Sequence, residues 1–236
     1  MRMSRFLVDL AWHRDGLRQL FETEPSPRYH LLYLQTHQHE QATAGPLLVE
    51  PASLVALQRY RPWVEEGLAI ELVSAQPFDR VADHLKTLTV IECEQAPPSL
   101  FRYADPRVLA GLEASLNAPE RARLLGPNER MRGVVAGQAW QLQQDTEAAA
   151  RYASSEAPFR LTRQHLQGIE AWRRQLMLQP LAAQYAISLE RLIDWYQEHH
   201  ATGVDNEQAC LEYCRRKAHE ARISDTRAHP EEEISS

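Results

Sequence analysis

The stretch "SLFRYADPRVLAGL", residues 99–112, contains closely spaced signals for a turn from a strand into a helix. Its apolar and aromatic start is typical of a strand, which we expect over 99–103. Asp105 can accept hydrogen bonds from the free N–H groups at a helix start, and Pro106 has the φ that suits a first helical position. Apolar residues then recur at helical spacing. The stretch therefore predicts a strand-to-helix corner at Asp105.

Arg102, Asp105 and Arg107 bring three charges to this corner, and their role has to be weighed. In one interpretation they form a structural clamp: Phe101, Asp105 and Pro106 shape the corner, and the arginines pair with acidic neighbours. In another, Arg102 and Arg107 bind a partner, because an exposed guanidinium can hold a carboxylate or a backbone carbonyl. We favour the clamp and keep partner binding as a hypothesis for the two arginines.

The alternative is an α/β enzyme with an unrecognised site near Asp105. Asp9, His84 and Glu92 would be its acid–base partners, although no spacing selects them. The sequence has no G-x-G-x-x-G, no Gly-rich phosphate loop with Lys and Ser, no G-x-S-x-G and no H-E-x-x-H. We therefore favour a structural over a catalytic role for this corner, and expect no catalytic residues and no cofactor.

Outward from the corner, residues 1–144 alternate between short apolar runs and helical patterns, which predicts an α/β N-terminal lobe with a mixed sheet. The segment 5–11 fits either a strand or a helix start. Strands are expected at 28–35, 45–50, 68–74, 88–94 and 99–103, and a hairpin over 132–143. Helices are expected to start near Ser53, Pro77, Asp105 and Asn117, and the first of them to end before Pro62.

The remaining chain predicts an all-helical C-terminal lobe at 160–222, after a linker at 145–159 and before a disordered acidic tail at 223–236. Pro180 should end or kink its first helix. Ser188 should cap the second helix, and Asp205 with Gln208 should start the third.

Composition points to a soluble protein. The chain has 236 residues, is 44% hydrophobic and 25% charged, and has a net charge of −6. We expect no nucleic-acid partner, since such proteins usually carry a basic excess, and no membrane partner, since no run approaches roughly 18 apolar residues. The three cysteines are an odd number, which favours a reducing compartment, and we expect the cytoplasm.

Two groups of histidines raise the question of a metal. Cys210 and Cys214 lie one helical turn apart and close in sequence to further nitrogen ligands: His199, His200 and His219. No C-x-x-C occurs, and the spacing of the histidines does not match that of usual zinc sites. His37 and His39 are more typical of a solvated loop. We expect no metal.

Four motifs in order resemble one known family. "FRYADPRVL" (101–109) is similar to F-R-[FY]-x-D-P-R-V-[LF], the signature of the Tap-type adaptor-chaperones of type VI secretion, long catalogued as a domain of unknown function. "GPLLVE" (45–50), "HLKTLTVIE" (84–92) and "LLGP" (124–127) resemble that family's flanking motifs, so that the resemblance covers about residues 30 to 142. The C-terminal half is similar in style, with Ala201-Thr202 in place of the usual aromatic residue.

The resemblance implies an adaptor-chaperone in the cytoplasm and not an enzyme. Such a protein binds a secreted effector and helps load it onto the VgrG or PAAR spike protein. Trp195 lies off the apolar face of its predicted helix and one turn after Arg191, so we expect both in a partner-binding groove between the lobes, with Arg102 or Arg107 at its other wall. Packing of Trp195 against the α/β lobe is the alternative. A DNA-linked regulator, suggested by "EYCRRKAHEAR" (212–222), is a further alternative.

Overall fold

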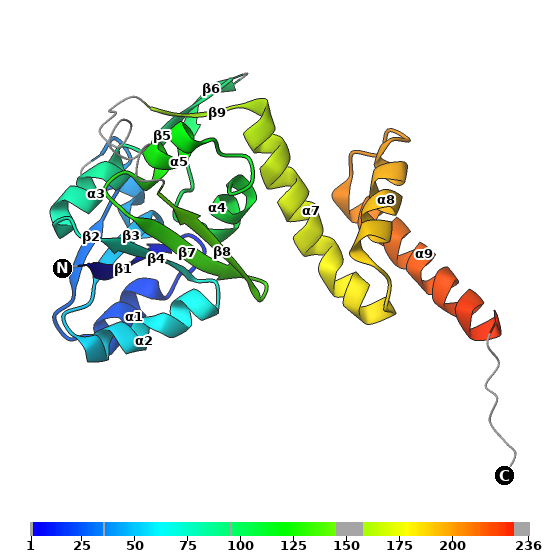
Figure 1. The fold of residues 1–236 in the computed structure, drawn as a ribbon, viewed down its shortest axis with the longest axis horizontal. Coiled ribbons are helices and arrows are strands. Elements are labelled where there is room, and N and C mark those ends of the chain that lie inside the picture. Colours follow the sequence, from blue (N-terminus) through cyan, green and yellow to red (C-terminus); the bar gives the residue numbers. More distant parts are fainter. Residues whose placement is uncertain (1, 35, 95, 145–157, 229–236) are drawn as a thin grey trace, which may run out of the picture. The chain divides into compact units, whose positions relative to one another are not determined.

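A computed structural model describes residues 2–34, 36–94, 96–144 and 158–228. Its main feature is a six-stranded antiparallel sheet with the order β2-β3-β1-β4-β7-β8 (Figure 1). The strands are β1 (Met3–Asp9), β2 (Arg28–Leu31), β3 (Pro46–Glu50), β4 (Ala69–Ser74), β7 (Arg130–Val135) and β8 (Gln138–Gln143). The segment 5–11, which fitted two interpretations, is therefore the central strand β1.

A second, smaller sheet has the order β6-β5-β9. Its strands are β5 (Val90–Cys93), β6 (Ala96–Leu100) and β9 (Phe159–Leu161). β5 pairs antiparallel with β6 and parallel with β9, so this sheet is mixed. Two details differ from the sequence prediction. β6 starts and ends earlier than the strand expected at 99–103, and β9 was not expected, because three residues are too few to show a periodic pattern.

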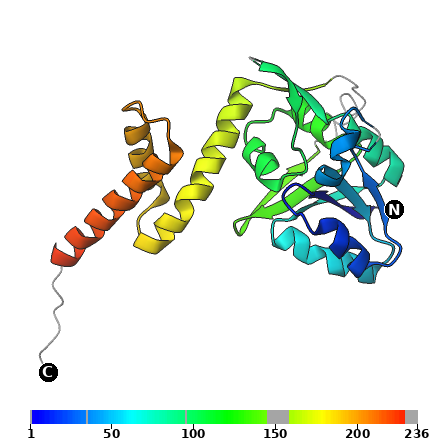
Figure 2. The ribbon, with the colours of Figure 1, turned by 180° about the vertical axis from the view of Figure 1, so that it is seen from behind.

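The helices alternate with the strands in the N-terminal half and follow one another without strands after β9 (Figures 1 and 2). They are α1 (Gly16–Thr23), the 3₁₀ helix η1 (His39–Ala44), α2 (Leu54–Glu65), α3 (Phe78–Lys86), α4 (Pro106–Leu112), α5 (Ala118–Leu125), α7 (Arg163–Tyr185), α8 (Leu189–His200) and α9 (Glu207–Ala228). The predicted fold class is confirmed: an α/β region is followed by a helical part.

Helix starts agree well with the sequence signals. The Oγ of Ser53 accepts a hydrogen bond from the N–H of Ala56, and Ser188 caps α8 in the same way. Asn117 and Glu120 form a full capping box at the start of α5. These predictions are confirmed. Each cap is a contact between residues three positions apart, so the local sequence was enough to predict it.

Three helix boundaries were predicted wrongly or incompletely. α2 does not end before Pro62 but continues to Glu65, because Trp63 and Val64 in its last turn are buried in the core. Pro180 likewise lies inside α7, which runs on to Tyr185. The N-cap of α9 is Asn206 and not Asp205, since the Oδ1 of Asn206 accepts hydrogen bonds from the N–H groups of Gln208 and Ala209.

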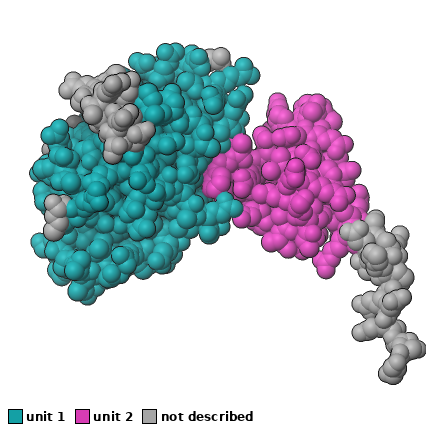
Figure 3. Space-filling view, in the orientation of Figure 1, with its two compact units in different colours: residues 1–170 teal, residues 171–236 magenta. Residues whose placement is uncertain are grey.

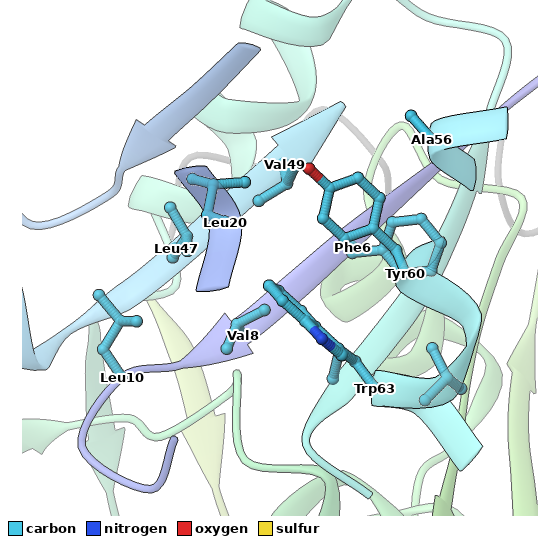
Figure 4. Close-up of a cluster of buried hydrophobic side chains, with 11 residues drawn as sticks. Phe6, Val8, Leu10, Leu20, Leu47, Val49, Ala56, Tyr60 and Trp63 are labelled. Atoms are coloured by element: carbon cyan, nitrogen blue, oxygen red, sulfur yellow. The ribbon is translucent and has the colours of Figure 1, made fainter. Parts of the chain in front are cut away.

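One face of the main sheet carries a buried apolar cluster beneath α1 and α2, which lie side by side (Figures 1 and 4). Phe6 and Val8 of β1 lie at its centre, and the ring of Phe6 is 5.3 Å from that of Tyr60. The other buried members are Leu10, Leu20, Leu47, Val49, Ala56, Trp63, Val64 and Ala69. Burial of this apolar surface stabilises β1 and, through Leu10, the start of the loop that follows it.

A separate cluster holds α7, α8 and α9 together. Its buried members are Leu178, Leu181, Leu192, Tyr196, Cys210, Cys214 and Ala218. The Sγ atoms of the two cysteines lie 3.7 and 3.6 Å from the carbonyl oxygens of Val204 and Leu192. Burial raises the pKa of Cys214 to about 11, so this thiol stays protonated.

The chain divides into two units, residues 1–170 and residues 171–236 (Figure 3). The predicted linker and tail fall largely on 145–157 and 229–236, which lie outside the described residues, so these boundaries stay a prediction. The first residues of the predicted tail, 223–228, belong to α9. Among the described helices, none has both the length and the apolar character to cross a membrane.

Candidate functional site

The corner at Asp105 is built from both oxygens of one buried carboxylate. Oδ1 accepts hydrogen bonds from the N–H of Arg107, 3.0 Å away, and from its Nε, 2.9 Å away, while Oδ2 accepts one from Nη2 at 2.7 Å. Asp105 is thus the N-cap of α4, and Pro106 lies at the first helical position, as predicted. The hydrogen bond and the charge of Asp105 raise the pKa of Arg107 above its usual range.

Asp9, at the end of β1, is joined to the same corner. Its Oδ2 accepts hydrogen bonds from Nη2 and Nε of Arg102, at 2.6 and 3.2 Å. Its Oδ1 accepts the N–H of Ala11 at 2.9 Å and so holds the turn that follows the strand. Arg102 also lies 3.7 Å from Oδ2 of Asp105. One arginine therefore links two carboxylates whose own side chains are 7% and 4% exposed.

Trp12 lies in the turn that Asp9 holds, and its ring contacts Arg107. The guanidinium carbon of Arg107 lies 3.8 Å from the centre of the Trp12 ring, within cation–π range. Trp12 is nevertheless 50% exposed. We call the set Asp9, Trp12, Arg102, Asp105 and Arg107 the arginine corner. Its two carboxylates hold the two partly exposed arginine side chains in place, and Arg107 in turn contacts the exposed indole.

A hollow of about 300 Å³ opens beside the arginine corner. Asp9 and Arg102 contribute to its wall, together with Ala11, Tyr33, Gln41, Ala44, Gly45, Pro46, Leu100 and Ala104. One apolar residue of this lining, Leu100, is 39% exposed. The hollow therefore combines an apolar lining with a charged wall.

Tyr33 is the aromatic residue in the lining of this hollow. Burial, and then the nearby charge of Asp9, raise the pKa of its phenol, so the ring stays neutral. A Cβ on Gly45 would lie 2.4 Å from Cδ2 of Tyr33, which explains the glycine at this close approach. Tyr33 thus contributes an uncharged aromatic side chain to the lining.

The arrangement is suited to binding rather than to proton transfer. Both oxygens of Asp105 are hydrogen-bonded to Arg107, and Asp9 is shared between Arg102 and its own turn. Of the acid–base partners considered from sequence, His84 contacts the carbonyl of Leu124, and Glu92 is exposed on β5. Two guanidinium groups and an indole that reach solvent can hold carboxylates, carbonyls and apolar side chains of another molecule.

Residues 6–123, which are half of the chain, match the model of a family described as "Domain of unknown function (DUF4123)". The chain belongs to the DUF4123 family. No curated protein and no solved structure matches it. The DUF4123 match extends from β1 to α5 and so includes every residue of the arginine corner. A larger hollow of about 660 Å³ beside β7 and β8 is lined in good part by residues 132–141, beyond the DUF4123 match.

Phe101 and Pro106, predicted to shape the corner of this DUF4123 chain, are both buried. The Phe101 ring stacks on Phe159 of β9 with ring centres 5.6 Å apart. Phe101 therefore joins the corner to the small sheet, while Arg102, the next residue, reaches the surface.

Trp195 and Arg191 lie outside the DUF4123 match, on α8. Trp195 is half-buried against the cluster of its own helices, with Arg191 5.0 Å and Lys217 5.9 Å from its ring. This packing differs from the free indole that the sequence suggested. Their place in a groove with Arg102 or Arg107 stays a prediction.

Asp9, Trp12 and Tyr33 were not singled out as binding residues from the sequence. A carboxylate that ends a buried strand and is followed by an exposed aromatic is the one local signal that could have drawn attention to Asp9 and Trp12. Nothing in the sequence connects them to Arg102 or Arg107. Among the described residues, no group of three or more His, Cys, Asp and Glu side chains is placed to hold a metal ion.

Proposed function

We propose that this chain is a cytoplasmic adaptor-chaperone of a type VI secretion system. It binds a secreted effector and helps load that effector onto the VgrG or PAAR spike protein. The proposal rests on the resemblance of four ordered motifs and on membership of the DUF4123 family. The family description leaves function open, so the link to secretion is our inference.

The arginine corner is the observation that carries the proposal. The motif that resembles the adaptor-chaperones, "FRYADPRVL", is the segment that supplies Arg102, Asp105 and Arg107 to it. Trp, Tyr and Arg are the residues that most often dominate the binding energy of protein interfaces. Here Tyr33 and Arg102 line the hollow, while Trp12 and Arg107 contact each other within the arginine corner beside it.

The effector segment that fits this surface has two properties. An apolar side chain can enter the hollow above Tyr33, where it removes apolar surface from water. Acidic side chains or backbone carbonyls next to it can accept hydrogen bonds from Arg102 and Arg107. Because the carboxylates of Asp9 and Asp105 hold both guanidinium groups in place, little side-chain entropy is lost on binding.

Affinity purification from the native cell, with mass spectrometry of the bound proteins, tests the proposal. Wild-type protein should recover an effector or a spike protein, and Trp12→Ala should recover much less effector. Leu54→Ala is the matched control, because Leu54 is an exposed apolar residue, 79% exposed, on α2 and not in the lining of the hollow. Absence of secretion proteins from every sample would contradict the function, and equal recovery by all variants would contradict the site.

A further inference from the structure

Four strands lie at the edges of the two sheets, and three of them have features that hinder pairing with another strand. β2 has four residues and carries the charged Arg28, β9 has three residues, and β6 contains Pro97 and Pro98. β8 has six residues, Gln-Ala-Trp-Gln-Leu-Gln, without a charge, a proline or a glycine. In the described sheet it pairs with β7 alone (Figure 1). Among the edge strands of the described residues, β8 is therefore the one without a feature that hinders pairing.

The β7–β8 hairpin decides which backbone groups of β8 point outward. Its loop has two residues, Ala136 and Gly137, with φ of 49° and 78°, as in the tight turns that favour hairpins. The residues that flank such a loop form a hydrogen-bonded pair, and hydrogen-bonded pairs then alternate along the ladder. The N–H of Gln144 donates to the carbonyl of Glu129 at 3.0 Å, which is where the alternation places a hydrogen-bonded pair. The backbone groups that point away from β7 therefore belong to every second residue: Ala139, Gln141 and Gln143.

We propose that β8 pairs with β8 of a second copy of this chain, antiparallel and about a two-fold axis at Gln141. The three outward-pointing residues are arranged symmetrically around Gln141. In this register Ala139 of each copy lies opposite Gln143 of the other, and Gln141 lies opposite its own copy. Every outward N–H and C=O of both strands then has a hydrogen-bond partner. The proposal is independent of the proposed function.

The side chains of β8 match themselves in the same register. Trp140 and Leu142, which are 4% and 1% exposed, share the buried face of the sheet and lie opposite each other across the new strand pair. Gln141 and Gln143 share the exposed face. Apolar residues thus meet apolar residues, polar residues meet polar residues, and no like charges meet. A two-fold interface requires this kind of self-complementarity.

Sedimentation equilibrium of the full chain over a wide concentration range tests the proposal. We expect the mass to rise toward that of two chains. Gln141→Pro should raise the dissociation constant of the dimer by roughly 10-fold or more, because it removes the N–H at the axis from both copies. The N–H of Gln141 takes no part in pairing with β7, so the sheet itself should persist. Gln141→Thr keeps the N–H and should keep the dimer.

A second variant covers the case in which Gln141→Pro fails to fold. In Gln141→Glu the new carboxylate lies opposite Arg132 of β7, so the fold of the single chain should tolerate it. Across the two-fold axis, however, the carboxylates of the two copies lie opposite each other and repel. We expect it to weaken the dimer, and added salt to restore part of the affinity.

Hydrogen exchange identifies the surface. The amides of Ala139, Gln141 and Gln143 should gain protection as the concentration rises, while those of Trp140 and Leu142 stay protected throughout. A single-chain mass at every concentration, or a dimer that Gln141→Pro and Gln141→Glu leave unchanged, would overturn the proposal. So would protection of these amides only after another protein is added, because the occupant of the edge would then be that protein.

Discussion

At the scale of single residues, Asp105 shows how one carboxylate serves two purposes. Its Oδ1 caps α4 through the N–H of Arg107, and both oxygens hold the Arg107 guanidinium. The second contact places that guanidinium over Trp12. A residue that the sequence predicts as a helix cap therefore also positions the guanidinium of Arg107.

His84 gives a residue-scale prediction on pH. Burial, with a smaller contribution from the charge of Arg123, lowers the pKa of its imidazole from the usual 6.5 to about 4, against the opposing effect of the hydrogen bond with the Leu124 carbonyl. The unfolded chain therefore takes up a proton at a higher pH than the folded chain does. Above pH 6.5 the imidazole is neutral in both states, so His84 does not lower the free energy of unfolding. As the pH falls from 6.5 toward 4, protonation of the unfolded chain should lower that free energy by up to about 3 kcal/mol.

Chemical denaturation of wild type and His84→Gln at several pH values measures this contribution. The variant should be less stable at neutral pH, because the ring packs closely against Gly126, where a Cβ would lie 2.2 Å from it. Its stability should nevertheless fall less steeply between pH 6.5 and 4, since other groups contribute equally in both proteins. Parallel pH curves would show that His84 does not titrate as its burial requires.

At the scale of elements, the start of α9 gives a prediction that separates two neighbouring residues. Asn206→Ala should lower the free energy of unfolding by about 0.5–2 kcal/mol, because its Oδ1 caps two N–H groups. Asp205→Ala should have little effect, since the side chain of Asp205 is 94% exposed. Thermal or chemical denaturation of both variants decides between them, and a larger loss for Asp205→Ala would contradict the cap described here.

The same contrast shows what could be predicted from the sequence. Caps at Ser53, Asp105 and Asn117 were predictable because the groups involved lie within three positions of one another. The tie between Asp9 and Arg102 was not, because the two residues are 93 positions apart and only the packing of β1 brings them together. β9 depends in the same way on its parallel partner β5.

At the scale of the whole molecule, the proposed binding surface lies on the N-terminal unit, where the segment that carries the signature motif meets the end of the central strand. The arginine corner and its hollow lie entirely within residues 1–170, which have their own apolar core. This unit should therefore carry the main contacts with the effector, whatever the helical unit contributes.

Calorimetric titration of the effector recovered by affinity purification into the full chain tests this central claim most directly. Trp12→Ala should weaken binding by about 10-fold or more, as expected for an interface residue worth at least 1.4 kcal/mol, while Leu54→Ala should bind like wild type. Circular dichroism should show all three proteins folded. Equal affinity of Trp12→Ala and wild type would contradict the claim that the arginine corner binds the effector.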